Sequence, residues 1–183
     1  MTIVPTQLKD AFIVEPAVFG DDRGFFFESF NQKVWTEKTG LTMPFVQDNH
    51  SRSARGVLRG VHFQLEQPQG KLVRVAVGEV FDAIVDLRRS SPSFGKWEGV
   101  HLSAANKRML WVPSGFGHGF LVLSESADFL YKVTDYYAPQ CERTLMWNDP
   151  RVGIAWPLAA GTGPTLSKKD QAGLAFEALA VFP

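Results

Sequence analysis

The feature that most constrains the fold of this chain is the length of its apolar segments, nearly all of which are short. They are rich in Val, Ile, Phe and Trp, and Gly, Pro, Asn, Asp and Ser separate them, a pattern typical of β-strands joined by turns. Within residues 81–87 the odd-numbered positions are all apolar while Asp82 and Asp86 face the other way, as on a strand with two different faces. Gly78 and Glu79 resemble a tight hairpin turn. The candidate strands are residues 25–30, 45–51, 57–63, 72–77, 80–87, 96–102, 109–112, 120–123, 129–135 and 144–147.

Strands of this number and length favour a double-sheet jelly roll or a barrel, because doubling or closing a sheet protects its edges. Helical signals lie at the periphery. Asn31 is a candidate cap for a short helix that ends near Gly40, and Ser167 for a C-terminal helix through Leu179. We therefore expect an all-β fold between about residues 20 and 150 with short helices at its edges, within a single domain that spans residues 1–183.

Charge and cysteine content limit the partners and the compartment. Lys and Arg together number 19, as do Asp and Glu, so the formal net charge is zero. This balance argues against a nucleic-acid partner or a basic membrane-binding face. Cys141 is the single cysteine, so no intrachain disulfide can form and a reducing compartment is expected. Neither a secretory leader nor a membrane-spanning run is apparent, so we expect a cytoplasmic protein.

A polar block at residues 47–52 interrupts the strand pattern. On a strand, Gln47, Asn49 and Ser51 point to the same side, where amide groups can bind the edge of a ligand. A solvated outer face or a turn is the commoner explanation of a lone Gln-x-Asn pattern.

His62 lies within a predicted strand, close in sequence to Arg59, Lys71 and Arg74. Cations near a buried imidazole are costly unless an anionic ligand or a carboxylate joins them, so this group is a candidate site. Ideal alternation places Arg59 and His62 on opposite faces, so they share a cavity only if Gly60 permits a bulge. The alternative is an ordinary core histidine.

Three further positions have both a structural and a functional interpretation. Tyr131 is either a proton donor or an ordinary strand aromatic. His118 lies between glycines that allow close approach of a ligand. Asp170 either caps a helix that begins after Ser167 or orients His62 as a general base.

The sequence predicts neither a metal site nor a nucleotide-binding loop. The four histidines, His50, His62, His101 and His118, are scattered singly, although Glu66 follows His62 by four positions. Glycine-rich phosphate motifs are missing, so Arg and Lys side chains would have to hold any phosphate group.

Eight sequence blocks carry a resemblance to a known family. They are residues 19–28, 47–51, 59–64, 71–74, 113–120, 131–137, 147–150 and 166–170. In their order and spacing they resemble the cupin-type dTDP-4-dehydrorhamnose 3,5-epimerase family. The resemblance implies a cupin-like jelly roll that epimerises dTDP-4-dehydro-6-deoxy-D-glucose at C3 and C5 through an enolate.

The resemblance also implies roles for individual residues. His62 would be the general base with Asp170 as its partner, Tyr131 the general acid on the opposite face of the sugar, and Lys71 the cation near the ketone. Substrate binding would fall to Lys71 and to Arg23, Glu28, Gln47, Asp48, Asn49, Arg59, His118, Tyr137, Glu142 and Lys169. Among these, Arg23 and Arg59 would hold the diphosphate and Tyr137 would stack on thymine.

Family members are homodimers without a metal or an organic cofactor, in which the segment that carries Arg23 and Glu28 reaches the partner's site. Two alternatives remain open at this point. A related keto-sugar mono-epimerase would share the His62 and Asp170 pair, and a non-catalytic sugar-binding jelly roll would share the aromatic and amide residues.

Overall fold

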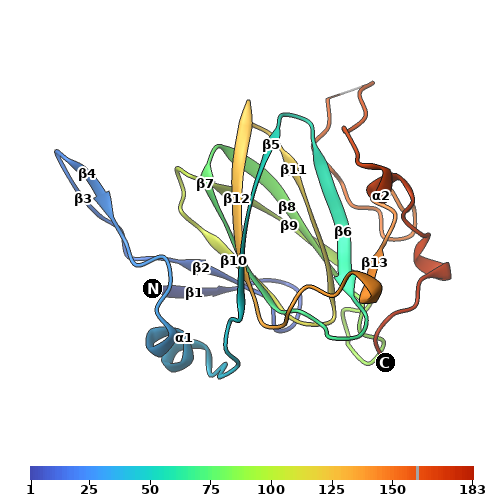
Figure 1. Cartoon of the computed structure of the whole chain (residues 1–183), viewed down its shortest axis with the longest axis horizontal. Coiled ribbons are helices and arrows are strands. Elements are labelled where there is room, and N and C mark those ends of the chain that lie inside the picture. Colours follow the sequence, from blue (N-terminus) through green and yellow to red (C-terminus); the bar gives the residue numbers. More distant parts are fainter. Residues whose placement is uncertain (160) are drawn as a thin grey trace.

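Two antiparallel sheets pack face to face in the computed structural model, which describes residues 1–159 and 161–183 (Figure 1). The six-stranded sheet has the order β1 (Thr2–Pro5), β2 (Phe12–Glu15), β10 (Met109–Val112), β7 (Lys71–Val77), β12 (Ser126–Val133) and β5 (Gln47–Ala54). The five-stranded sheet has the order β13 (Glu142–Thr144), β6 (Leu58–Gln64), β11 (Phe116–Val122), β8 (Glu79–Asp86) and β9 (Trp97–Ser103). The prediction of an all-β double-sheet fold with peripheral helices is confirmed.

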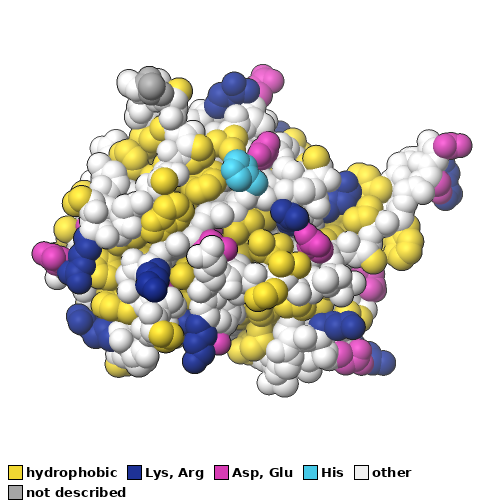
Figure 2. Space-filling view, turned by 180° about the vertical axis from the view of Figure 1, so that it is seen from behind, with side chains coloured by type: hydrophobic (Ala, Val, Ile, Leu, Met, Phe, Trp, Pro, Cys, Tyr) yellow, Lys and Arg dark blue, Asp and Glu magenta, His cyan; other side chains and the backbone are white. Residues whose placement is uncertain are grey.

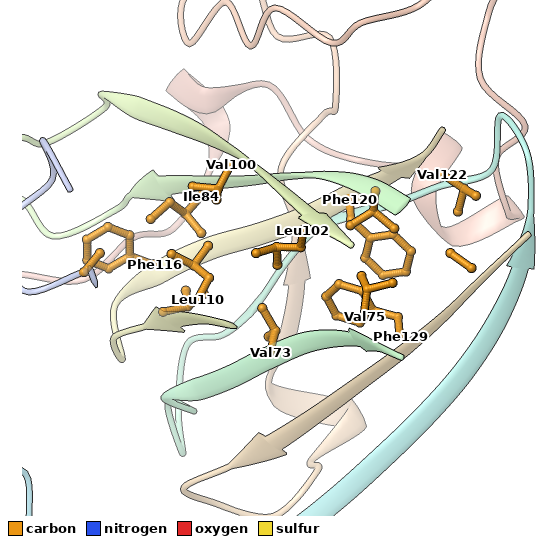
Figure 3. Close-up of a cluster of buried hydrophobic side chains, with 14 of the residues drawn as sticks. Val73, Val75, Ile84, Val100, Leu102, Leu110, Phe116, Phe120, Val122 and Phe129 are labelled. Carbon is orange, nitrogen blue, oxygen red and sulfur yellow. The ribbon is translucent and has the colours of Figure 1, made fainter. Parts of the chain in front are cut away.

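The main core lies between the sheets (Figure 3). Val73 and Leu110 of the six-stranded sheet meet Ile84 and Leu102 of the five-stranded sheet, and all four side chains are fully buried. Burial of a side chain of this size contributes about 1.5–3 kcal/mol relative to exposure. This contact fixes the spacing between the sheets.

The C-terminal part of the chain covers the outer face of the five-stranded sheet. Phe81 and Val85 of β8 pack there with Ile154 and Phe176, in a second buried cluster. Strand β8 is therefore buried on both faces, and its residues are apolar except for Glu79, Asp82 and Asp86.

Strands β3 (Phe19–Asp21) and β4 (Gly24–Phe26) form a separate hairpin that projects from the body of the molecule (Figure 1). We call residues 18–26 the arm. Phe19, Phe25 and Phe26 are exposed to 66%, 62% and 67%. Figure 2 shows charged side chains at the tip of the arm and hydrophobic ones nearer its base.

The predicted N-terminal helix is confirmed. Helix α1 (Gln32–Thr39) begins after Asn31, whose side chain accepts a hydrogen bond from the backbone N–H of Val34. It ends at Gly40, which has a φ of 72° and donates its backbone N–H to the carbonyl of Thr36. Asparagine at the start and glycine in the left-handed conformation at the end are the usual helix boundaries.

The lower limit of the β fold was placed too late in the chain. Strands β1 and β2 precede residue 20 and extend the six-stranded sheet beyond β10. Phe12 of β2 packs against Trp35 of α1, with ring centroids 5.7 Å apart. Because these strands are short, their pairing depends on long-range contacts that local sequence does not reveal.

The predicted hairpin at Gly78 is wrong. Strand β7 belongs to one sheet and β8 to the other, so the chain crosses between the sheets at this point instead of pairing with itself. Gly78 has a φ of 77°, and a Cβ there would collide with the carbonyl of Ser126. The glycine therefore allows a close crossing, not a hairpin.

The predicted C-terminal helix is much shorter than expected. Helix α2 (Lys168–Gln171) ends well before Leu179, and a 3-10 turn follows at Phe176–Ala178. Beyond α2, Leu174 forms a bridge with Leu145, and a Cβ at Gly173 would lie 2.9 Å from the Met146 backbone. The chain runs too close to the backbone of Met146 for a helix to continue.

Within residues 1–159 and 161–183, no helix is long and apolar enough to cross a membrane.

Candidate active site

A cavity of about 630 Å³ opens between the two sheets beside α2. Strands β5, β7 and β12 of one sheet line it, together with β6, β11 and β13 of the other. This volume is within the usual range for small-molecule sites, about 300–1,000 Å³. The cavity brings together eleven of the sequence-predicted site residues: Gln47, Asn49, Arg59, His62, Lys71, His118, Tyr131, Tyr137, Glu142, Lys169 and Asp170.

Three predicted site residues lie outside this cavity. Arg23 is at the tip of the arm, where it pairs with Asp21 and its side chain is 90% exposed. Glu28 accepts a hydrogen bond from Asn31 at the start of α1. Asp48 lies on the other face of β5 from its neighbours and pairs with Lys132, with its oxygens 2.9 Å from the Lys132 Nζ.

The bulge expected at Gly60 is present. Between β6 and β11, His62 pairs with His118 while Arg59 pairs with Phe120, so β6 has one residue more than β11 over this stretch. Gly60 has a φ of 134°, and its backbone N–H donates a hydrogen bond to Oδ1 of the buried Asp170 at 3.1 Å. The irregularity turns Arg59 and His62 into the same cavity, which ideal alternation would not do.

His62 and Asp170 lie side by side in the wall of the cavity. Nε2 of His62 is 2.7 Å from Oδ1 of Asp170, although the two atoms lack the alignment of a hydrogen bond. Asp170 also caps α2, because its Oδ2 accepts from the backbone N–H and the hydroxyl of Ser167. Asp170 thus contacts both Ser167 at the start of α2 and the imidazole of His62, one through each carboxylate oxygen.

Burial shapes the protonation of this pair. It lowers the pKa of the His62 imidazole below its usual value, the Asp170 carboxylate opposes that shift, and the charges of Lys169 and Lys71 add to it. Burial would raise the pKa of Asp170, but the His62 contact and the hydrogen bonds from Ser167 and Gly60 hold it well below its usual range. At neutral pH the pair is a neutral imidazole beside a carboxylate, the state required of a general base.

Lys71 enters the same cavity from β7. Burial lowers the pKa of its ammonium group to about 8, against the attraction of the carboxylates of Glu142 and Asp82. At neutral pH most of the Lys71 side chains carry a positive charge in a poorly solvated site. A cation in such a site is well suited to stabilise a developing oxyanion.

Tyr131 enters from β12, in the sheet opposite to the one that carries His62. Burial raises the pKa of its phenol, the Glu142 carboxylate raises it further, and Arg59 opposes the shift. Tyr131 therefore keeps its proton at neutral pH. It lines the cavity in its protonated form.

A chain of polar contacts crosses the cavity wall beside Tyr131. The hydroxyl of Tyr137 donates to Oε2 of Glu142 at 3.0 Å, and Nζ of Lys169 lies 2.9 Å from Oε1 of the same carboxylate. The Tyr137 residue is half exposed. Its ring is accessible to a flat ligand.

The polar face of β5 lines the cavity, so the solvated outer face considered as an alternative does not describe it. Gln47, Asn49 and Ser51 are all lining residues. The Gln47 amide donates to Oδ1 of Asn49 at 2.8 Å and accepts from the backbone N–H of Tyr137 at 3.1 Å. These contacts orient the amides at the cavity surface.

Asp82 does not line the cavity but contacts a residue that does, and the sequence did not indicate this contact. It is fully buried on β8, and both carboxylate oxygens lie within 3.0 Å of Nε2 of His118. Alternation placed Asp82 on the opposite face of the strand from Phe81 and Ala83, but it did not reveal that this face is buried as well. Among the described residues, no group of three or more His, Cys, Asp and Glu side chains is placed to hold a metal ion.

Comparison with known proteins places these features in a family. Residues 5–178 match the family model described as dTDP-4-dehydrorhamnose 3,5-epimerase. The enzyme of that name from Pseudomonas aeruginosa is 60% identical over 176 residues, which cover 96% of each chain. The one from Salmonella typhimurium is 58% identical over 94% of this chain and 93% of its own.

Solved structures agree with the sequence comparison. A crystal structure of dTDP-6-deoxy-D-glucose-3,5-epimerase from Legionella pneumophila, in complex with dTDP-4-keto-L-rhamnose, superposes with a TM-score of 0.94. The two proteins are 52% identical, and the match covers 98% of this chain and 94% of the other. The match in sequence over nearly the whole chain and the match in fold show that this chain belongs to the dTDP-4-dehydrorhamnose 3,5-epimerase family.

Proposed function

We propose that this chain epimerises dTDP-4-dehydro-6-deoxy-D-glucose at C3 and C5 to give dTDP-4-dehydro-L-rhamnose. One observation carries the proposal: a single cavity receives His62 with Asp170 from one side and Tyr131 with Lys71 from the opposite sheet. A base, an acid and a cation are the groups that this reaction needs. The family relationship supplies the substrate.

The chemistry follows from the acidity of carbons next to a ketone. Removal of a proton from C3 or C5 gives an enolate, whose negative oxygen needs a nearby cation. His62 takes the proton, the Lys71 ammonium stabilises the oxyanion, and Tyr131 returns a proton from the other face. Return to the opposite face inverts the carbon. Each positioned acid or base contributes about 10²- to 10⁴-fold in rate.

Residues around this centre would hold the nucleotide. Arg59 lies at the cavity, where its Nε donates to the Ser53 hydroxyl at 2.9 Å and its Nη2 to the Arg52 carbonyl at 3.5 Å, so its Nη1 would face the diphosphate. The half-exposed ring of Tyr137 would stack on thymine. The further contacts would come from Gln47, Asn49, His118, Glu142 and Lys169.

We further propose that the active form is a homodimer in which the arm reaches the partner's cavity. The arm exposes Phe19, Phe25 and Phe26, and an isolated chain gains nothing by exposing three large aromatics on one hairpin. It also carries Arg23 away from the cavity of its own chain. A second copy would bury the aromatics and would receive Arg23 and Glu28 beside its own Arg59.

The proposal requires neither a metal nor an organic cofactor, because the imidazole, phenol and ammonium groups supply the proton transfers and the charge. We place the enzyme in the cytoplasm. Its single buried cysteine suits a reducing compartment.

Proton exchange in deuterated water tests the proposal. The chain is incubated with dTDP-4-dehydro-6-deoxy-D-glucose in D₂O, and deuterium at C3 and C5 is followed by NMR. Uptake at both carbons, with formation of the L-sugar, is the expected result. Uptake at C3 alone would instead identify a mono-epimerase. Binding without uptake at either carbon would identify a sugar-binding protein and overturn the proposal.

A further inference from the structure

We propose that Ser167 is a positioning residue for proton abstraction: its hydroxyl fixes the carboxylate of Asp170, which in turn orients the imidazole of His62. The inference rests on the proposed function of His62 as the general base. Ser167 would thus join the pair formed by His62 and Asp170, with a catalytic positioning role in addition to its role as a helix cap.

The contacts of Asp170 are divided between its two oxygens. Oδ2 accepts the Ser167 hydroxyl at 2.6 Å and the Ser167 backbone N–H at 3.3 Å. Oδ1 accepts the backbone N–H of Gly60 at 3.1 Å and lies 2.7 Å from Nε2 of His62. The carboxylate is therefore held on the side of α2 by Ser167 and on the side of β6 by Gly60.

The Ser167 hydroxyl takes part in two hydrogen bonds at once. It donates to Oδ2 of Asp170 and accepts the Asp170 backbone N–H at 3.2 Å. A hydroxyl has both a donor and acceptor sites, so the two bonds are compatible. Backbone and side chain of Asp170 are thus fixed by the same atom.

His62 does not itself fix the orientation of the carboxylate. Its Nε2 is close to Oδ1 but is not aligned with it as a hydrogen-bond donor. Helix α2 has only four residues, and so short a helix has little stability of its own. The position of Asp170, which is 3% exposed, must come from Ser167 and Gly60.

Orientation matters because proton transfer depends steeply on geometry. A displacement of about 1 Å in a catalytic group can cost about 10²-fold in rate. A carboxylate that rotates away from His62 also loses its ability to stabilise the imidazolium formed on proton abstraction. Loss of the Ser167 hydroxyl should therefore reduce turnover while leaving substrate binding largely intact.

Two other roles for Ser167 have to be separated from this one. Ser167 is the N-cap of α2, so its loss could act through stability alone. It also lines the cavity, so its loss could remove a contact to the substrate. The first role predicts a lower melting temperature, and the second predicts a higher KM with kcat unchanged.

Three substitutions distinguish these roles. Ser167→Gly removes the hydroxyl, yet glycine is itself well tolerated at an N-cap, so the melting temperature should change little. Ser167→Thr keeps the hydroxyl. Ser167→Asp keeps a strong N-cap acceptor but has no donor and repels Asp170, so it stays informative if the glycine variant fails to fold.

The matched control is Ser103→Gly. The Ser103 hydroxyl accepts the backbone N–H of Asn106 at a turn, as a cap does, and Ser103 does not line the cavity. This control should leave kcat unchanged.

Steady-state kinetics and thermal melts of these variants are measured together with deuterium exchange by the wild-type protein. We expect kcat to fall about 10- to 100-fold in Ser167→Gly and Ser167→Asp, with KM within about twofold of wild type. Ser167→Thr should restore kcat to within about threefold.

An unchanged kcat in Ser167→Gly or Ser167→Asp, or a rise in KM alone, would overturn the assignment. Failure of Ser167→Thr to restore turnover would do the same. If the wild-type protein exchanges no proton, the proposed function fails. Exchange by the wild type together with unchanged turnover in the variants would reject only the role of Ser167.

Discussion

His62 and Tyr131 enter one cavity from opposite sheets, His62 from β6 and Tyr131 from β12. At neutral pH the imidazole is neutral and the phenol keeps its proton, because burial lowers the pKa of the imidazole and raises that of the phenol. In the proposed mechanism, a sugar between them would meet a proton acceptor on one face and a proton donor on the other. The two-sheet architecture thus provides the geometry for inversion of a carbon centre.

Substitution of Asp170 should affect both activity and stability. In Asp170→Ala we expect a loss of kcat of about 10²-fold or more, because His62 loses its carboxylate. We also expect a fall in melting temperature of a few degrees, because the capping box of α2 is broken. Asp170→Asn keeps a capping oxygen, so it should lose activity with little change in melting temperature. Wild-type turnover by Asp170→Asn would contradict the role of the carboxylate.

The pH profile of kcat/KM should be bell-shaped. On the acid side His62 must be neutral, and its lowered pKa puts this limb below pH 6.5. On the basic side Lys71 must be charged, so the rate should fall as pH rises through about 8. The charged groups that face His62 are Asp170, Lys169 and Lys71, and those that face Lys71 are Glu142, Asp82 and Lys169.

Lys71→Arg is the control for the basic limb. Arginine stays charged throughout this range, so the limb near pH 8 should move to higher pH even if the maximal rate is lower. A basic limb that stays in place in Lys71→Arg would show that another group titrates there.

Lys71→Met should raise stability while it abolishes activity. The pKa of Lys71 is lower in the folded chain, at about 8, than its ordinary value of 10.5, so the folded state binds this proton more weakly than the unfolded state does. The charged lysine is therefore destabilising at pH 7, and its contribution improves as pH rises from 8 toward 10.5.

Differential scanning calorimetry at pH 7 should show a melting temperature several degrees higher for Lys71→Met than for wild type, with a gap that narrows toward pH 10. Lys96→Met, at an exposed lysine, should change little. A lower melting temperature in Lys71→Met would mean that attraction to Asp82 and Glu142 outweighs burial.

Mixed dimers test whether Arg23 acts in the partner's cavity. Arg23→Ala and His62→Ala should each be nearly inactive alone. If the arm crosses the dimer, each mixed dimer has one intact cavity, and equal mixing restores about a quarter of wild-type activity. If Arg23 acts in its own chain, no mixed dimer has an intact cavity. Activity that stays at the level of the separate variants after subunit exchange would contradict the crossed arm.

Local sequence predicted the strands whose two faces differ and the helix bounded by Asn31 and Gly40, because those signals arise from neighbouring residues. The same signals failed at Gly78, where the chain changes sheets, and beyond α2, where Leu174 pairs with Leu145. Both features depend on partners far along the chain. Local patterns carry no information about them.

The candidate site was predicted through motif blocks more than through residue chemistry. Sequence alone left Asp170 divided between a cap and a partner of His62. One of its oxygens belongs to the cap and the other lies beside His62, and the catalytic role of that second contact stays a prediction. The bulge at Gly60 followed from the need to turn Arg59 and His62 to one side. Asp82 was missed because alternation does not show that both faces of β8 are buried, the face that carries Asp82 by the other sheet and the opposite face by the C-terminal segment.

The comparison of Tyr131→Phe with His62→Ala in D₂O tests the central claim most directly, since it separates proton removal from inversion. Tyr131→Phe keeps the base, so it should still exchange the protons at C3 and C5 for deuterium while inversion slows by about 10²-fold or more. His62→Ala should lose both exchange and inversion. Equal loss of exchange and inversion in Tyr131→Phe would contradict the account of a base and an acid acting from opposite sheets.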